Sequence, residues 1–379
     1  MKKKVCILGS TGNIGISTLE IISKDKKNFD VILLSGNSNY NLLISQAVKF
    51  KPKYIYSSNF FLTQKIKYVC KINKIIIISD LNQLKKIKFD ITVSAISGIA
   101  GLLPTLNIIK FSKKILIANK ESIICGWKFI NKELKKYNCS FTPIDSEHFS
   151  IFNLIKDKNK NSIKNIYLTA SGGPFFNKKI NLKNVTPLQA AKHPNWKMGK
   201  KISIDSANLM NKILEVIEAS LIFNLPINKF KIIIHPQSLI HAIIQFRNGL
   251  SSMMHHDNDM KIPIANSFYD NFYIKNELSN KFSIEKVLSF YNPNIKKLPS
   301  IKILGLSRVL NDTGFILINV LNEILVEKFL INKILFTDIV YKLLDILNSK
   351  AVKNYLKNNR IRHINDVFKA YNFCRSLVN

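Results

Sequence analysis

Acidic residues are scarce in this sequence: 24 Asp and Glu stand against 57 Lys and Arg, and the formal net charge is +33. Long apolar runs are also missing, and none approaches the ~20 residues that a membrane-spanning helix needs. The apolar run that follows the N-terminal lysines ends at Gly9, too early for the core of a signal peptide. These absences predict a protein that stays in the compartment where it is made.

Cysteine is scarce as well, and its spacing shows no pairing. The number of cysteines is odd and no CxxC pair occurs, which argues against a disulfide framework and against a zinc site. We therefore expect reduced thiols in a cytoplasmic protein. The five residues are Cys6, Cys70, Cys125, Cys139 and Cys374.

The positive charge invites a nucleic-acid hypothesis. Most of the excess is lysine rather than arginine, and it is spread evenly, without a long basic block or interleaved aromatic residues. Together with the many Ile and Asn residues, this is typical of general compositional drift. We expect a cationic surface that attracts anionic small molecules, and no nucleic-acid or membrane partner.

A chain of 379 residues is too long for one ordinary core. Over residues 1–145, short apolar runs alternate with amphipathic segments, a pattern typical of a parallel, doubly wound sheet. The expected strands are Lys4–Leu8, Val31–Ser35, Tyr54–Tyr56, Ile75–Ile78, Ile91–Ser94, Ile115–Ala118 and Ser140–Thr142. The expected helices are Ile14–Ser23, Leu42–Phe50 and Ile123–Tyr137.

The remaining sequence predicts an α/β protein with three regions. A Rossmann-like parallel sheet domain (1–145) precedes a central α+β catalytic domain (146–270), a polar linker (271–295) and a C-terminal helical domain (296–379). The later expected strands are Ile163–Thr169, Lys231–Ile234 and Ala242–Phe246. The later expected helices are Leu209–Phe223, Ile316–Leu330 and Asp338–Leu347.

A glycine-rich turn, GSTGNIG over residues 9–15, follows the first expected strand and opens the first helix. Glycines let the backbone approach a pyrophosphate, and the helix N-terminus supplies free N–H groups. No acidic residue ends the second strand, where NAD-binding proteins usually place one, so we predict NADPH. A second loop, residues 94–98, follows the fifth strand, where the far half of the bound cofactor would lie. The alternative is a tight structural turn without a ligand.

Two carboxylates, Asp145 and Glu147, follow the last strand of this region. On an extended chain, side chains two residues apart point the same way, and two such carboxylates repel unless a cation lies between them. Oxygen ligands of this kind suit Mg²⁺ or Mn²⁺. A solvated loop is the alternative. Glu215 and Glu218 are both candidates for a third carboxylate, and helical spacing does not choose between them.

Two loops could bind a phosphate group. Residues 169–174 (TASGGP) end a strand and offer a hydroxyl and flexible backbone N–H groups. Residues 205–208 (DSAN) lead into a helix that carries Asn211 and Lys212. Each loop alone could be an ordinary helix cap. Together, beside a metal site, they predict a phosphorylated polyol as the substrate.

At this point the sequence resembles the 1-deoxy-D-xylulose 5-phosphate reductoisomerase family. The resemblance rests on six ordered motifs from residue 5 to about 265, and more faintly on residues 321–323. The motifs are GSTGNIG, IANKES, PIDSEH, SGGPF, HPNWKMGKKISIDSANLMNK and IHPQSLIHA. The resemblance implies NADPH-dependent rearrangement and reduction of 1-deoxy-D-xylulose 5-phosphate to 2-C-methyl-D-erythritol 4-phosphate. It also implies a homodimer, inhibition by fosmidomycin, and a divalent metal, Mn²⁺, Mg²⁺ or Co²⁺.

The motifs also imply roles for individual residues. The metal would be held by Asp145, Glu147 and Glu215, with NKxLE selecting Glu215 over Glu218. The substrate would meet Lys120, Ser146, Glu147, Ser171, His193, Ser206, Asn211, Lys212 and Glu215. The cofactor would meet Thr11, Gly12, Asn13, Ile14, Gly36, Asn37, Ser38, Asn119, Glu121 and Gly199. Catalysis would fall to Lys120, Asp145, Glu147, His193 and Glu215, while the segment around Trp196 and Met198 would close over the site.

Two segments depart from the family pattern. Asn37 and Ser38 stand where the family often has Lys or Arg, which implies one charged contact fewer to the cofactor's 2′-phosphate. Residues 251–263 (SSMMHHDNDMKIP) replace a Gly-Glu/Tyr-Pro-Asp-Met-Arg-type run, and the sequence leaves His255, His256 and Asn258 unexplained.

Two other functions compete with this one. Another NADP-dependent dehydrogenase could act on a phosphorylated polyol without rearrangement. A binding-only protein, such as a decayed NADP sensor, is the alternative from a different class. The presence of all three carboxylates beside Lys120 and His193 argues against decay, because compositional drift would have eroded unused acids.

Overall fold

The computed structural model describes the chain except residues 85–86, 197, 270–286, 295–296 and 379. Its internal contacts divide it into two compact units, each described by itself. The first unit contains Met1–Ser122, Trp127–Phe149 and Met260–Ser279. The second contains Ile123–Gly126, Ser150–Asp259 and Asn280–Asn379.

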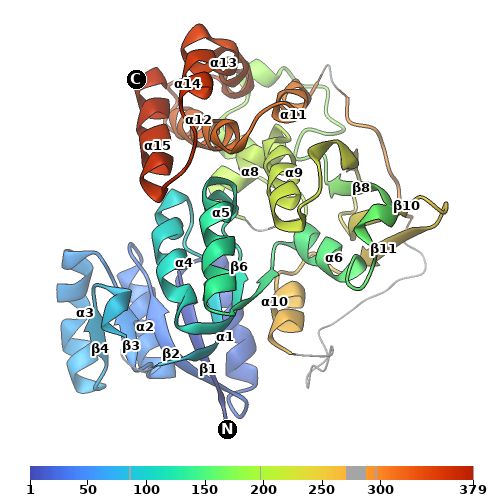
Figure 1. Cartoon of the computed structure of the whole chain (residues 1–379). Helices are drawn as coiled ribbons and strands as arrows, with labels where there is room; N and C mark the ends of the chain where they lie inside the picture. Colours follow the sequence, from blue (N-terminus) through green and yellow to red (C-terminus); the bar gives the residue numbers. More distant parts are fainter. Residues whose placement is uncertain (85–86, 197, 270–286, 295–296, 379) are drawn as a thin grey trace. The chain divides into compact units, whose positions relative to one another are not determined.

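The first unit is built on a parallel sheet of seven strands in the order β4-β3-β2-β1-β5-β6-β7 (Figure 1). The order reverses between β1 and β5, and in such sheets ligands bind beyond the carboxyl ends of the strands at this point. The expected Rossmann-like fold is confirmed, and every expected strand is present with ends shifted by a few residues at most. The strands are β1 (Lys3–Leu8), β2 (Phe29–Ser35), β3 (Tyr54–Tyr56), β4 (Ile76–Ile78), β5 (Phe89–Ser94), β6 (Ser112–Ile117) and β7 (Ser140–Pro143).

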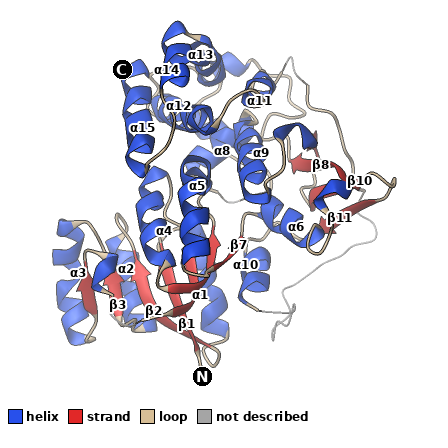
Figure 2. Cartoon of the chain, viewed as in Figure 1, coloured by secondary structure: helices blue, strands red, loops and turns tan. Residues whose placement is uncertain are grey.

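Helices complete the first unit (Figure 2). Buried apolar residues on the sheet, such as Val5, Leu34 and Val93, form its core because parallel strands are covered on both faces. The chain returns late to this unit, where Phe268 packs edge-on against Phe29 with ring centroids 5.3 Å apart. The helices are α1 (Asn13–Lys24), α2 (Tyr40–Phe50), α3 (Phe60–Ile72), α4 (Leu102–Ile109), α5 (Lys120–Lys136), which also runs through the second unit's short segment, and α10 (Lys261–Phe268).

The second unit contains a four-stranded mixed sheet in the order β11-β10-β8-β9. Only β8 and β9 run parallel within it. The strands are β8 (Ile163–Ala170), β9 (Phe230–Ile234), β10 (Ile240–Phe246) and β11 (Ser251–His255). The expected strands in this region are confirmed, whereas β11 was not expected from the sequence.

The rest of the second unit is helical, as the sequence predicts for its C-terminal part. The long helix α12 is buried over most of its length and contacts α8, α13 and α15. The helices are α7 (Pro187–Ala190), α8 (Lys200–Ala207), α9 (Met210–Phe223), α11 (Ile301–Ser307), α12 (Asp312–Leu330), α13 (Phe336–Asn348), α14 (Lys350–Asn358) and α15 (Ile364–Val378). Among the described residues, no helix is long and apolar enough to cross a membrane.

Most of the expected linker, residues 271–295, lies outside the described residues. In its described part, Tyr291 forms an antiparallel bridge with Ile234, the last residue of β9. The backbone N–H of each residue donates to the carbonyl of the other at 2.8 Å. The chain at Tyr291 is therefore hydrogen-bonded to the sheet of the second unit.

Candidate active site

The glycine-rich turn lies at the carboxyl end of β1 and begins helix α1. Gly9 has φ +82°, and a Cβ there would lie 2.5 Å from the carbonyl oxygen of Ala95, so this position requires glycine. At Gly12, a Cβ would meet only the Gly9 carbonyl oxygen, at an ordinary 3.5 Å. The fold itself therefore leaves room above Gly12 and does not require glycine there.

Neighbouring elements hold this turn in place. The Gly9 N–H donates to the Ser35 hydroxyl at 2.8 Å, and the Ser10 hydroxyl donates to the side-chain oxygen of Gln46 at 2.7 Å. Gly36 and Asn37 follow β2 directly, and no carboxylate stands there. The turn is thus preorganised, with uncharged residues where a ribose-binding acid would lie.

Asn119 connects the loop after β5 with helix α5. Its side-chain oxygen accepts a hydrogen bond from the Ser122 N–H at 2.6 Å and caps the helix. Its amide donates to the Gly98 carbonyl at 2.8 Å and also to that of Ile96. The buried Asn119 therefore fixes the second loop, and a cofactor contact from it stays a prediction.

Asp145 and Glu147 stand at the start of helix α6 (Ser146–Leu154), not on an extended chain. The expected extended geometry is wrong because the Asp145 carbonyl accepts the Phe149 N–H at 2.8 Å, the first turn of this helix. The Glu147 N–H also lies 3.3 Å from a carboxylate oxygen of Asp145. A carboxylate at a helix N-terminus is stabilised by the free N–H groups there.

Two basic side chains fix the Asp145 carboxylate. The Nδ1 of the fully buried His148 lies 3.1 Å from one oxygen, and the Nζ of Lys120 lies 4.0 Å from the other. The Nδ1 of His148 is thus directed at the carboxylate. Sequence reasoning missed this pairing, although the three-residue spacing on a helix could have indicated it.

Glu215 lies on α9 among the residues expected to bind phosphate. The Asn211 amide donates to one of its oxygens at 2.5 Å, and the Nζ of Lys212 lies 2.6 Å from the other. Lys212 and Glu215 are both buried. One helix thus presents an amide, an ammonium and a carboxylate on neighbouring turns.

The carboxylates expected to hold a metal come from both units. Asp145 and Glu147 stand two residues apart at the start of α6 in the first unit, and Glu215 is a buried carboxylate of α9 in the second. Carboxylate oxygens alone favour a hard cation such as Mg²⁺ or Mn²⁺. The donor chemistry therefore fits the expected metal.

The two expected phosphate loops meet in the second unit. Gly173 has φ +71°, and a Cβ there would lie 2.9 Å from the Ser206 carbonyl oxygen, so glycine allows the close approach. Between Ser206 and Asn211, Leu209 adopts an unusual left-handed conformation with φ 69° that joins α8 to α9. Backbone strain of this kind is common at binding sites.

His193 lies beside the first of these loops. Its Nε2 is 3.0 Å from the Ser171 hydroxyl, and its Nδ1 accepts the N–H groups of Asn195 and Trp196 at 3.2 and 3.0 Å. Because Nδ1 is an acceptor, the ring hydrogen is on Nε2 and is donated to Ser171. The structure therefore brings His193 and Ser171 together, a contact that the sequence did not predict, and their roles toward the substrate stay predictions.

His235, in the motif IHPQSLIHA, is buried and stacks on Phe290 with ring centroids 4.7 Å apart. Burial lowers the pKa of His235, with a smaller contribution from His255, while the hydrogen bond to the Ser289 carbonyl acts in the opposite direction. His235 is consequently neutral at physiological pH, which suits a structural role.

Profiles of one protein family match most of the chain. The profile described as 1-deoxy-D-xylulose 5-phosphate reductoisomerase matches residues 5–126. Two C-terminal domain profiles of the same enzyme match residues 141–223 and 257–377. A reductoisomerase of this name from Pelagibacter ubique is 46% identical, with 96% of each chain covered. The chain belongs to the 1-deoxy-D-xylulose 5-phosphate reductoisomerase family.

Further relatives and solved structures agree with this membership. The reductoisomerase of Clostridium novyi is 36% identical over 99% of this chain and 98% of its own. A DOX-P reductoisomerase in complex with NADPH, fosmidomycin and magnesium superimposes with a TM-score of 0.91 at 33% identity, covering 99% and 97% of the two chains. The Zymomonas mobilis enzyme with NADPH gives a TM-score of 0.85 at 30% identity, covering 99% and 98%.

Proposed function

We propose that this protein is an NADPH- and divalent-metal-dependent reductoisomerase that converts 1-deoxy-D-xylulose 5-phosphate to 2-C-methyl-D-erythritol 4-phosphate. This reaction supplies the non-mevalonate route to isoprenoid precursors. The observation that carries the proposal is that a member of this family has the carboxylates of Asp145 and Glu147 at the start of α6 and that of Glu215 buried on α9. A related enzyme that binds NADPH, fosmidomycin and magnesium supports it.

Asp145, Glu147 and Glu215 would hold the metal, which is Mg²⁺, Mn²⁺ or Co²⁺. When bound, the metal polarises the substrate's carbonyl and adjacent hydroxyl and orients both for rearrangement. His148 and Lys120 orient the carboxylate of Asp145, and Asn211 and Lys212 do the same for Glu215. All three ligands are thus supported by hydrogen-bonding neighbours or a helix N-terminus.

The glycine-rich turn would bind NADPH, the source of the hydride. Thr11, Asn13 and Ile14 would offer backbone N–H groups to its pyrophosphate at the start of α1, and Gly12 would let the pyrophosphate approach the backbone. The other proposed cofactor contacts are Gly36, Asn37, Ser38, Asn119, Glu121 and Gly199. The room above Gly12 is what supports this assignment.

Different residues would contact the carbon backbone and the phosphate of the substrate. Lys120 and Ser146 would contact its carbon backbone, and Ser171, Ser206, Asn211 and Lys212 would bind its phosphate. His193 would meet the substrate from the segment 193–199. That segment would exclude water while the hydride is transferred.

We further propose three working regions, a homodimer and a cytoplasmic location. Residues 1–145 would bind NADPH, 146–270 would carry catalysis, and 271–295 would link these to the helical residues 296–379. The dimer is supported by Leu250 and Met253 at the edge strand β11, which are 67% and 48% exposed. Light scattering that shows a single 43.4 kDa chain at micromolar concentration would contradict the dimer. The free, buried cysteines support a reducing compartment.

The proposal is tested by following NADPH oxidation with 1-deoxy-D-xylulose 5-phosphate and Mn²⁺. We expect consumption of NADPH that fosmidomycin inhibits, that EDTA abolishes and that is slower with NADH. Identification of 2-C-methyl-D-erythritol 4-phosphate as the product excludes a dehydrogenase that does not rearrange its substrate. A binding-only protein would consume no NADPH.

A further inference from the structure

His256, which the sequence leaves unexplained, lies beside His241, a residue of the motif IHPQSLIHA that contacts Trp196. His241 on β10 and His256, the residue after β11, stack face to face with ring centroids 3.8 Å apart and planes inclined by 18°. The ring of Trp196 meets His241 edge-on at 6.0 Å. Both imidazoles are buried, whereas Trp196 is half-buried. We call the stacked pair of imidazoles, His241 and His256, the aromatic seat, and Trp196 contacts its His241 ring.

The backbone fixes the two imidazoles in this arrangement. The register of β10 on β11 shifts between Ile240 and Ala242, which places His241 at an irregularity that redirects its side chain. The His256 N–H donates to the Leu239 carbonyl at 3.0 Å and continues the pairing one residue past β11. The irregularity on one strand and the extension of the other bring the rings together.

Hydrogen bonds to carbonyl oxygens orient both rings. The Nε2 of His241 lies 3.2 Å from the His256 carbonyl, and the Nδ1 of His256 lies 2.8 Å from the Asp257 carbonyl. A carbonyl oxygen only accepts, so each of these nitrogens carries the hydrogen. His256 thus contacts His241 with its ring and with its carbonyl, and fixes its plane.

Two other sets of hydrogen bonds, which we call anchors, hold the residues that precede Trp196. His193 is bound to Ser171, and the Asn195 amide donates to the Pro236 carbonyl at 2.7 Å and to the Ser238 hydroxyl at 2.9 Å. The aromatic seat is the third anchor, and it holds the residue that follows Asn195. These anchors hold the segment with His193 already directed at the phosphate-binding Ser171.

We infer that His256 is a positioning residue that, through His241, seats Trp196 and thereby preorganises the segment 193–199 for substrate binding. Ordering this segment in advance reduces the entropy lost when substrate binds. The inference rests on the role proposed above for that segment. Its first test, however, needs no substrate, metal or cofactor.

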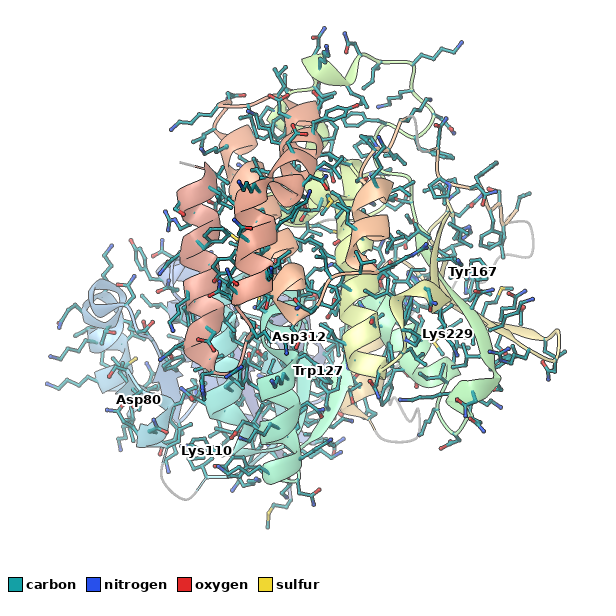
Figure 3. The ribbon with its side chains drawn as sticks, turned by 45° about the horizontal axis from the view of Figure 1, so that its top comes forward. Asp80, Lys110, Trp127, Tyr167, Lys229 and Asp312 are labelled. Atoms are coloured by element: carbon teal, nitrogen blue, oxygen red, sulfur yellow. The ribbon has the colours of Figure 1, made fainter. Side chains whose placement is uncertain are left out.

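The test uses Trp196 as an optical reporter. The sequence has two tryptophans, and the other is Trp127, which Figure 3 labels. Trp127 packs against Phe141 on the first unit's sheet. In a Trp127→Phe background, emission comes from Trp196 alone. We expect His256→Ala to shift this emission to the red and to raise the acrylamide quenching constant about twofold or more, since aromatic contacts shift an equilibrium by about two- to tenfold.

Two further variants separate stacking from general damage. His256→Phe keeps a flat ring and should restore the wild-type emission and quenching. His255→Ala removes the neighbouring imidazole, which is outside the aromatic seat, and should change neither. Circular dichroism checks that each variant is folded. Wild-type quenching in His256→Ala, or no restoration by His256→Phe, overturns the inference.

The second test is kinetic. If the aromatic seat preorganises the binding segment, His256→Ala should raise KM for the phosphorylated substrate about two- to tenfold and leave kcat within about twofold. A loss of kcat of this size with an unchanged KM would overturn the inference. If the proposed function is wrong, the wild-type protein will be inactive in this assay. The fluorescence test does not depend on that activity.

Discussion

The side-chain amide of Asn322 donates a 2.8 Å hydrogen bond to the carboxylate of Asp205, and both residues are buried. The Nζ of Lys201 lies 3.3 Å from the other oxygen of Asp205. Asp205 directly precedes Ser206, which we assign to the phosphate site. One amide of helix α12 therefore supports the end of helix α8, which contains Ser206.

We expect Asn322→Leu to lower the free energy of unfolding by about 1–3 kcal/mol, because it removes one partner of a buried carboxylate. KM for the substrate should rise as the end of α8 loses its support. Urea unfolding and steady-state kinetics measure the two effects. Asn319→Leu on the same helix is the matched control, since that amide is directed at the weak acceptor Cys125 Sγ at 3.6 Å. Equal kinetic effects of both variants would contradict a specific link to the phosphate site.

The choice of Glu215 over Glu218 is open to a direct test. We expect Glu215→Gln to reduce turnover by at least about a hundredfold, because a neutral amide binds a hard cation far more weakly than a carboxylate. Binding of NADPH, measured by its fluorescence, should stay near wild type. Glu218→Gln, also buried and on the same helix, should keep its turnover. Near-normal activity in the Glu215 variant would remove it from the metal site.

The sequence predicted the sheet closely, because short apolar runs between amphipathic segments leave few alternatives. β3 matches its expected bounds, Tyr54–Tyr56, to the residue. The extended geometry predicted at Asp145 was wrong for a local reason. Two carboxylates two residues apart resemble a strand, whereas an Asp followed by an apolar helical face is also the signal for the start of a helix.

Other parts of the site have no local signal. The partners Asn322 and Asp205 are 117 residues apart, and the pair is made only by the packing of α12 against α8. The stack of His241 and His256 depends on a strand irregularity that no pattern of residues announces. The motifs therefore indicated which residues take part, and tertiary contacts decided how they are supported.

The uncharged residues after β2 predict a modest preference for NADPH over NADH. Asn37 and Ser38 stand near the expected 2′-phosphate and bring no charge. We expect Asn37→Arg to raise the ratio of kcat/KM for NADPH to that for NADH by about tenfold, since a charged hydrogen bond contributes about 1.5–3 kcal/mol. Asn41→Arg adds the same charge on the exposed face of α2 and should leave the ratio unchanged. An unaltered ratio in the Asn37 variant would place the 2′-phosphate elsewhere.

Thiol chemistry provides a prediction that does not depend on the active site. The five cysteines are buried and outside any disulfide bond, and burial raises the pKa of Cys70 and Cys139 to about 11 and that of Cys374 to about 12. Unfolded thiols titrate near 8.5. The folded state therefore keeps its thiol protons longer, and stability that is complete below about pH 8.5 should decline as the pH rises toward these folded-state values. Native protein at pH 8 should react slowly with Ellman's reagent, and urea should release five reactive thiols. Rapid reaction of one thiol in the native protein would show that it is exposed, against the burial found here.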